Sequence, residues 1–364
     1  MEVIPFDMAI LSTLFYLALT LLLMGVLIFV HELGHYLTAR ACNVTIYEFS
    51  LGMGKRLAGF TSKKTGIQYS LRLLPIGGYV SMAGEDETKE GEEDDPNAFN
   101  KKNVWQRILI LVAGAGMNIL TGALAMLILV SGMSMAGYKL PSTTVAKFAE
   151  GASSYVTGLE TGDKILKVDG VRVHTGYDLS YEIMFNGYKP VELLVERDGQ
   201  QIVLSNVTFP SGIEEGIELG SMDFYVLADQ TNLKNILKTT LYRSTSSIKM
   251  VFDSIHGIAT GRFTLASMSG PIGVSSAVAD VASKPMAGWN ILYLFALIAM
   301  NLGVMNMLPI PALDGGRVFF RIIEILRFGK PINPKFEATV HGVGMTILLM
   351  LTAVIALKDL FAIF

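Results

Sequence analysis

The chain is poor in charge and in cysteine, and each shortage excludes a class of protein. Charged residues make up 17% of the 364 residues and hydrophobic residues 51%, whereas a soluble domain carries about 25% charged residues. The single cysteine, Cys42, excludes an intramolecular disulfide and a cysteine-rich zinc knuckle. A net charge of −3 gives no reason to expect a nucleic-acid partner. The composition therefore predicts a protein of the lipid bilayer.

Four stretches are apolar enough to cross a bilayer, which takes about 20 residues. They cover residues 8–30, 108–130, 289–313 and 338–357. The first stretch has an acidic start instead of the basic start of a cleaved signal peptide, so we expect it to be retained. No lysine or arginine precedes it, ten lie between the first and second stretches, and five lie between the third and fourth. Because such residues collect on the cytoplasmic side, both of these connections are expected there.

The segments between the spans carry other patterns. Residues 44–82 are rich in β-branched and aromatic residues bounded by glycines, which predicts a β-hairpin or small sheet. Residues 85–97 are acidic without an apolar period and predict a solvated loop. Residues 232–261 have apolar side chains at near-helical spacing, which predicts an amphipathic helix.

Residues 140–210 alternate short β-like runs with turn signals, which is typical of a small extramembrane domain. The segment "GLETGDKILKVDGVRV" resembles the core of PDZ domains. Such domains bind an extended peptide as an added strand. An inert spacer domain is the alternative interpretation.

The chemistry is concentrated in the sequence HELGH at residues 31–35. Two histidines four positions apart lie on one side of a helix, as two ligands of one tetrahedral zinc ion require. Glu32 lies beside them and is suited to move a proton between water and the leaving amine. Ionisable groups at the end of an apolar span are costly and usually functional.

A catalytic zinc normally has three protein ligands, and Asp314 is the best candidate for the third. It follows the third span in "NMLPIPALDGGR", where prolines and glycines indicate a broken helix. A helix N-cap is the alternative role for Asp314. His341 in the fourth span is a weaker candidate and is otherwise a packed, hydrogen-bonded residue. Asn118 and Asn306 are unusual in apolar spans, and they either join helices or bind the substrate backbone; the position of Asn306 favours substrate binding.

The order of these motifs resembles the site-2 protease family of intramembrane metalloproteases, and within it the bacterial regulator of sigma-E type. The resemblance rests on HELGH, "LPIGGYVSM", "NAFNKKNVWQRILILVAGAGMN", a PDZ-like insert, "SGPIGV" and "NMLPIPALDGGR". It implies one zinc ion per chain, bound by His31, His35 and Asp314, with Glu32 as the catalytic acid and base. It also implies substrate binding by a β-hairpin and by a proline-rich segment; the residues are Gly77, Gly78, Tyr79, Asn306, Pro309 and Pro311. One departure is Gly114-Ala115, where the family often has Gly-Pro.

The expected fold is a membrane α-helical bundle of four transmembrane helices with a membrane-associated β-hairpin or sheet and an inserted α+β PDZ-like domain. In order, the expected segments are the first span with HELGH (1–40), the cytoplasmic hairpin and acidic loop (41–106), the second span (107–132), the PDZ-like domain (138–212), an amphipathic helical linker (213–287), the third span (288–316), a basic cytoplasmic segment (317–337) and the fourth span (338–364).

The resemblance implies cleavage, in the cell (inner) membrane, of transmembrane segments of single-span proteins such as anti-sigma factors or remnant signal peptides. An earlier extracytoplasmic cut would precede it, with the PDZ-like domain outside the cell membrane and the active site near the cytoplasmic side. Two alternatives stay open. One is an inactive membrane adaptor with a PDZ-like domain, and the other is a membrane zinc hydrolase of a lipid or small molecule.

Overall fold

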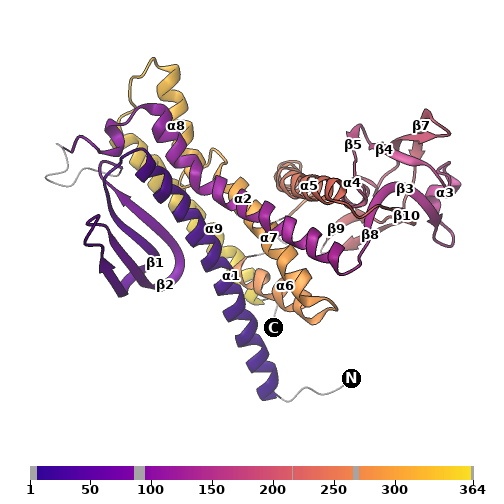
Figure 1. Ribbon diagram of the computed structural model, residues 1–364, viewed down its shortest axis with the longest axis horizontal. Coiled ribbons are helices and arrows are strands. Elements are labelled where there is room, and N and C mark those ends of the chain that lie inside the picture. The colour runs from indigo at the N-terminus through magenta and orange to yellow at the C-terminus, as the bar shows by residue number, and fades with distance from the viewer. Residues whose placement is uncertain (1–5, 86–94, 215, 265–269, 362–364) are drawn as a thin grey trace. The chain divides into compact units, whose positions relative to one another are not determined.

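The computed structural model describes residues 6–85, 95–214, 216–264 and 270–361. The predicted acidic loop therefore falls mostly outside the described residues. The chain divides into two compact units (Figure 1). Residues 1–122 and 269–364 form the first, called here the membrane unit, and residues 123–268 form the second, called the inserted unit.

Four described helices are long and apolar enough to cross a membrane, which confirms the predicted number of spans. They are α1 (Phe6–Ala41), α2 (Val104–Met135), α7 (Ala287–Asn306) and α9 (Pro334–Phe361). Shorter helices are η1 (Phe99–Lys101), α6 (Pro271–Ser283) and α8 (Asp314–Leu326). Large apolar side chains such as Leu22 and Leu349 are exposed along the spans, as expected for a surface that faces lipid.

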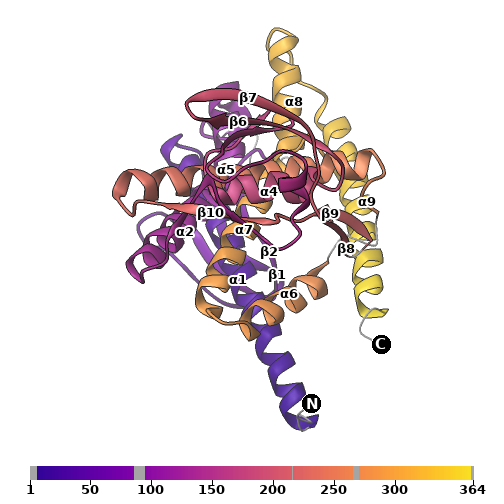
Figure 2. The same cartoon turned by 90° about the vertical axis from the view of Figure 1, so that its right-hand side faces the viewer.

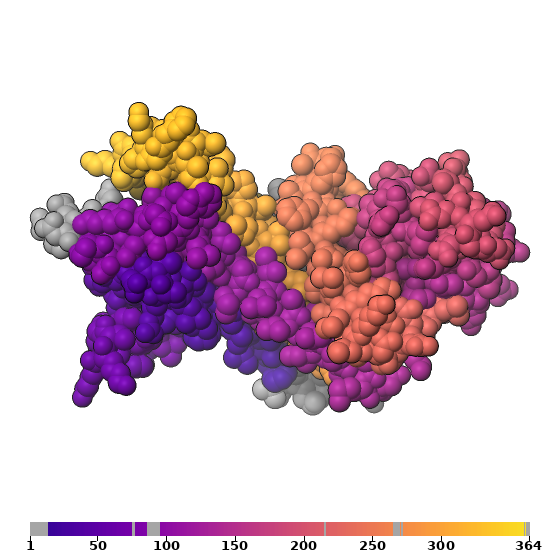
Figure 3. Space-filling view, turned by 45° about the horizontal axis from the view of Figure 1, so that its top comes forward, coloured from indigo at the N-terminus to yellow at the C-terminus, as the bar shows by residue number. Residues whose placement is uncertain are grey.

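The third span ends earlier than its sequence suggested. Helix α7 stops at Asn306, residues 307–313 are irregular, and α8 begins at Asp314. Pro309 and Pro311 have no amide hydrogen for a helical bond, and Ala312 has a left-handed φ of 82°. The expected third span over 288–316, whose prolines and glycines predicted a break, is thus two helices joined by a short turn. In the space-filling view the gold to yellow segment, where α8 leads into α9, forms a surface lobe of the membrane unit (Figure 3).

The predicted hairpin is a sheet made of two long strands, β1 (Ile46–Thr61) and β2 (Gln68–Met82). Both strands bend, so residues 48–51 pair with residues 78–81 on one side and with residues 68–71 on the other. Residues 56–61 also pair with residues 68–72. Among the described residues this leaves the segment 78–82 at one edge of the sheet. The sheet lies beside α1 (Figure 1).

The core of the membrane unit lies where the sheet meets the ends of α1 and α2. Its buried side chains are Tyr36, Ala39, Cys42, Val44, Ile46, Phe49, Ile67, Val80, Met82, Phe99, Ile110, Leu111 and Val318. Cys42 is therefore a packed core residue, and no disulfide is formed. Burying apolar area of this kind contributes roughly 25 cal/mol per Å², so the sheet is held firmly against the helix that carries HELGH.

The inserted unit is built on a six-stranded sheet with the order β10-β3-β4-β6-β7, in which β5 pairs with β4. Its elements are β3 (Leu140–Phe148), α3 (Ser153–Val156), β4 (Lys164–Val168), β5 (Val171–Arg172), α4 (Gly176–Asn186), β6 (Val191–Arg197), β7 (Gln200–Val207), β8 (Ser211–Glu214), β9 (Ile217–Gly220), β10 (Phe224–Asp229) and α5 (Leu233–Ala259). Buried aliphatic residues such as Leu159, Ile165 and Leu193 fill its core. Helices α4 and α5 lie side by side (Figure 2).

The predicted helical linker over 213–287 begins with β-strands in the structure and not with a helix. Residues 211–214 and 217–220 pair as the antiparallel strands β8 and β9, and β10 returns to pair with β3. The sheet therefore ends at Asp229 and not near residue 212. Only α5 matches the predicted amphipathic helix, and Asn232 caps its first turn by accepting a hydrogen bond from the backbone N–H of Asn235.

Candidate metal centre

His31 and His35 lie one turn apart near the C-terminal end of α1. Their Nε2 atoms are 3.2 Å apart, and their ring centroids are 4.8 Å apart. Residues four apart on a helix share a face, so the local sequence accounts for this pairing. Both side chains are largely buried.

Asp314 approaches the same point from the first turn of α8. Its Oδ2 atom lies 3.1 Å from Nε2 of His31 and 3.2 Å from Nε2 of His35. The N-cap of α8 is Leu313, and no side-chain cap bond is formed there. The alternative role of Asp314 as an N-cap is therefore wrong, because its carboxylate meets the two imidazoles instead.

The three ligand atoms fit a metal ion. All lie within 4.8 Å of one another, and Oδ2 of Asp314 is buried without a hydrogen bond to any described residue. A cation would satisfy the lone pairs of two neutral imidazoles and a carboxylate that meet in this way. Two histidines and one carboxylate are also the donor set of several catalytic zinc sites, which leave a fourth position open.

The two glycines after Asp314 explain how the carboxylate reaches this place. A Cβ added at Gly315 would lie 2.2 Å from the carbonyl oxygen of Leu308, and one at Gly316 would lie 2.4 Å from that of Ile310. The turn after α7 therefore folds directly onto the start of α8, which only glycine permits. His341 braces this turn, because its Nδ1 accepts a hydrogen bond of 3.0 Å from the backbone N–H of Ala312. His341 is not among the three converging ligands.

Helix α2 forms the wall behind the histidines. Nδ1 of His35 lies 2.8 Å from the carbonyl oxygen of Ile110, so the ring donates there and keeps Nε2 free for a metal. A Cβ at Gly114 would lie 2.2 Å from Nε2 of His35. The amides of Asn118 and Asn306 both approach Nδ1 of His31, with their Nδ2 atoms at 3.4 Å and 3.5 Å.

The edge segment of the sheet passes next to Glu32. A Cβ added at Gly78 would lie 2.8 Å from Cγ of Glu32, whereas Gly77 has a left-handed φ of 79° and makes the preceding bend. The hydroxyl of Tyr79 donates a hydrogen bond of 2.8 Å to Glu48. Of the three hairpin residues singled out in the sequence, Gly78 lies closest to the candidate acid.

Glu48 anchors a polar cluster inside the sheet. Burial alone would raise its pKa, but hydrogen bonds from Ser70, Tyr79 and Arg72 outweigh this effect and lower the pKa to about 2. The guanidinium of Arg72 lies 2.8 Å from Oε1 of Glu48 and also donates to Ser50 and to the carbonyl of Gly54. The bent strands are thus held together by an ion pair that stays charged at neutral pH.

The proline residues take different positions. Pro311 packs against α9, because a Cβ added at Gly344 would lie 2.4 Å from Cβ of Pro311. Pro309 is exposed. Pro311 therefore shapes the turn that precedes Asp314, whereas Pro309 lies at the surface of the described structure.

A buried ion pair fixes α8 to α2, and sequence reasoning missed it. Arg107 Nη2 lies 2.5 Å from Oε1 of Glu324 and Nη1 lies 3.1 Å from Oε2. Arg321 joins the same carboxylate at 3.1 Å and also pairs with Glu337 at the start of α9. In the sequence, Arg107 indicated only membrane orientation. Nothing in a single sequence links two residues 217 positions apart.

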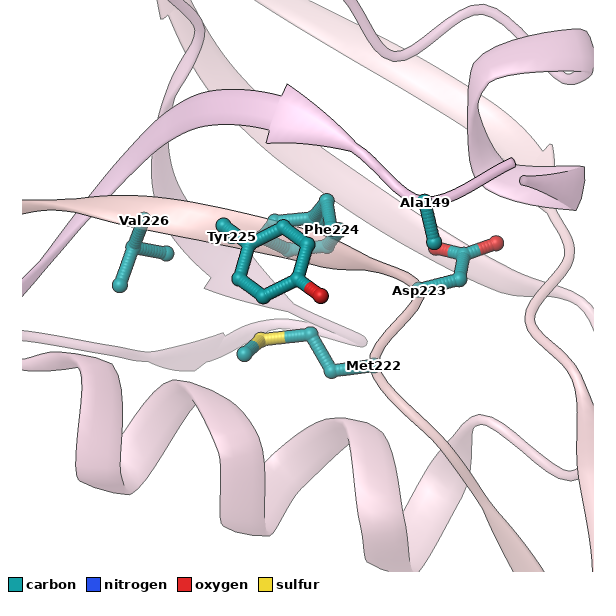
Figure 4. A pocket seen from close by; sticks show the side chains of 6 residues that line it. All are labelled: Ala149, Met222, Asp223, Phe224, Tyr225 and Val226. Atoms are coloured by element: carbon teal, nitrogen blue, oxygen red, sulfur yellow. The ribbon is translucent and has the colours of Figure 1, made fainter. Parts of the chain in front are cut away.

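A cavity lies elsewhere, in the inserted unit. Its volume is about 390 Å³, and it is lined by Ala149 and by residues 222–226 at the start of β10 (Figure 4). The three metal-ligand candidates all belong to the membrane unit. The cavity is thus a separate feature from the metal centre.

Comparison with known proteins agrees with this geometry. The model of peptidase family M50 matches residues 19–351. A putative zinc metalloprotease of Clostridium acetobutylicum is 34% identical over 346 residues, which cover 95% of this chain and 97% of the relative. The regulator of sigma-W protease RasP of Bacillus subtilis is 28% identical, over 93% of this chain and 97% of the relative. This multi-pass membrane chain therefore belongs to peptidase family M50, the site-2 protease family of zinc metalloproteases.

Proposed function

We propose that this zinc metalloprotease cuts peptide bonds within transmembrane segments of single-span proteins. His31, His35 and Asp314 would hold the zinc ion, and Glu32 would be the catalytic acid and base. The observation that carries the proposal is the convergence of three ligand atoms from two remote helices. One of these helices is long and apolar enough to span the membrane, and the other follows directly after such a helix.

The reaction is hydrolysis of an amide. Zinc bound at this centre supplies a Lewis acid that polarises water and the scissile carbonyl. Glu32 takes one proton from the attacking water while the water oxygen bonds to the carbonyl carbon. As the C–N bond breaks, Glu32 passes that proton to the leaving nitrogen. Truncating Glu32 would therefore remove turnover and leave the ligands of the metal in place.

A helix inside a membrane hides its peptide bonds in hydrogen bonds, so it must be unwound before cleavage. The edge segment 78–82 supports an account of how this happens. Its backbone at Gly78 adjoins Glu32, and an edge strand offers free N–H and C=O groups to an extended chain. Gly77 and Tyr79 would shape this edge. Asn306, Pro309 and Pro311, at the end of α7 and in the turn that follows it, would contact the unwound substrate as well.

The inserted unit would act as a PDZ-like filter outside the cytoplasm, with the active centre near the cytoplasmic side. The support for this is a sheet with a helix at its side, an edge strand β10 and the cavity at the start of that strand. A filter of this kind would admit substrates already shortened outside the membrane. Anti-sigma factors and remnant signal peptides are the substrate classes we propose, and the name of the Bacillus subtilis relative refers to sigma-factor regulation.

The test is cleavage of a single-span model substrate by the purified, zinc-loaded chain in detergent or vesicles. We expect a cut within the span that stops after chelation and in Glu32→Gln. The two other candidate functions predict different outcomes. An inactive adaptor would bind the substrate without cutting it, and a lipid or small-molecule hydrolase would leave the substrate whole.

A further inference from the structure

His31 meets two amides at one ring nitrogen, and this arrangement distinguishes their roles. Nδ2 of Asn118 lies 3.4 Å from Nδ1 of His31, and Nδ2 of Asn306 lies 3.5 Å from the same atom. Nε2 of His31 is the atom that faces Asp314. A neutral imidazole that binds a metal through Nε2 carries its proton on Nδ1. That N–H needs an acceptor, and an amide can offer one only through its oxygen.

Burial selects which amide supplies that acceptor. Asn118 is fully buried, and its Oδ1 has no hydrogen-bond partner among the described residues. Asn306 is only partly buried. A half-turn of an amide about its last bond exchanges oxygen and nitrogen. Applied to Asn118, it puts the orphaned oxygen on the N–H of His31 and satisfies two buried groups at once.

We infer that Asn118 is a positioning residue that holds His31 in its metal-binding tautomer and leaves Asn306 for the substrate. This inference rests on the zinc site of the proposed function. One face of helix α2 then contacts both histidines, because residues 110, 114 and 118 are spaced by four and lie on the same side of the helix. The carbonyl of Ile110 accepts from His35, Gly114 makes room for its ring, and Asn118 accepts from His31.

The same geometry explains why two asparagines stand in such apolar helices. An amide within a membrane span is costly unless it finds partners. Asn118 has one in His31. The side chain of Asn306 lies at nearly the same distance, but His31 Nδ1 has a single proton to donate. The amide of Asn306 is therefore available to hydrogen-bond the backbone of an extended peptide.

The test compares zinc affinity, measured by competition with a chromophoric chelator, in three variants of the full chain. Asn118→Leu keeps the size of the side chain and removes the acceptor, so we expect zinc affinity to fall by about 10- to 100-fold. Asn118→Asp restores an acceptor and should bind zinc within a few-fold of the unaltered chain. Asn306→Leu is the matched control, and it should retain zinc affinity while losing cleavage.

A second measurement does not depend on the folding of any variant. Solid-state ¹⁵N NMR of the zinc-loaded, histidine-labelled chain, which has five histidines, should show His31 protonated at Nδ1. The inference is overturned if Nδ1 is unprotonated, if Asn118→Leu keeps full zinc affinity, or if the Asp variant loses as much as the Leu variant. If His31→Ala leaves zinc binding intact, the proposed site itself is wrong. The two failures are therefore separable.

Discussion

Replacing Gly114 with alanine should destroy the metal centre although no ligand residue is substituted. The added Cβ would lie 2.2 Å from Nε2 of His35 and 2.7 Å from its Cε1, whereas non-bonded atoms rest about 3.5 Å apart. The ring would have to move by more than about 1 Å. Ligand distances in a metal site tolerate only about 0.2 Å, so Nε2 would leave the site.

Helices α1 and α2 cannot easily move apart locally to relieve the clash between the new Cβ and His35. They are already in contact at Gly34 of α1, where an added Cβ would lie 2.4 Å from the carbonyl oxygen of Ala113 in α2. Overpacking of this kind typically costs about 1–3 kcal/mol of folding free energy. We expect zinc affinity to fall by more than about 100-fold, because changes behind a ligand already cost 10- to 100-fold. Chelator competition measures the affinity, and thermal unfolding in detergent measures the stability.

Gly116→Ala is the matched control, since no atom lies within 4 Å of the added Cβ. It should keep zinc and activity, and it should stabilise the helix by up to about 1 kcal/mol. If Gly114→Ala binds zinc as tightly as this control, the placement of α2 behind His35 is wrong.

Three further predictions concern the surroundings of the site. Truncating Arg107 to alanine removes both of its hydrogen bonds to the buried carboxylate of Glu324 and leaves Arg321 as the partner of that carboxylate, which should lower the free energy of unfolding by up to about 3–5 kcal/mol; thermal unfolding checks this, and an unchanged midpoint would contradict it. Gly78→Val should block the edge beside Glu32, so that cleavage is lost while zinc content stays at one per chain; normal cleavage would contradict the proposed path of the substrate. The pKa of Glu48 lies below its ordinary value, so its contribution to stability is complete above about pH 4.5 and is lost as the pH falls through about 2. Hydrogen exchange of the sheet between pH 5 and 2 should show this loss, and Glu48→Gln should remove that part of the pH dependence.

The spans and the two halves of the metal site could be predicted from the sequence because their signals are local. Hydropathy identifies α1, α2, α7 and α9, and the spacing within HELGH places two histidines on one face. The prolines and glycines around Asp314 indicated a broken helix, and the structure has that break one turn earlier than expected, after Asn306. Local patterns thus indicated the candidate ligands, although they misplaced the end of a helix.

Other features depend on contacts between remote segments and could not be predicted. Arg107 and Glu324 form a buried pair only because α8 packs on α2. Strand β10 falls in a segment that was predicted to be a helical linker. Its six residues alternate only partly between buried and exposed positions, so their pattern does not indicate a strand without knowledge of the pairing with β3. The contact between Asn118 and His31 likewise requires two helices to pack. A single sequence states the composition of each segment and not which segments meet.

Zinc-edge X-ray absorption of the purified chain shows directly whether zinc binds at the centre shared by α1 and α8. We expect one zinc ion with two imidazole nitrogens and carboxylate or water oxygens at about 2.0–2.1 Å. The imidazole contribution should be reduced in His35→Ala, and the oxygen contribution should change in Asp314→Ser. A spectrum that is unchanged in both variants would place the zinc elsewhere and contradict the assignment of a centre shared by α1 and α8.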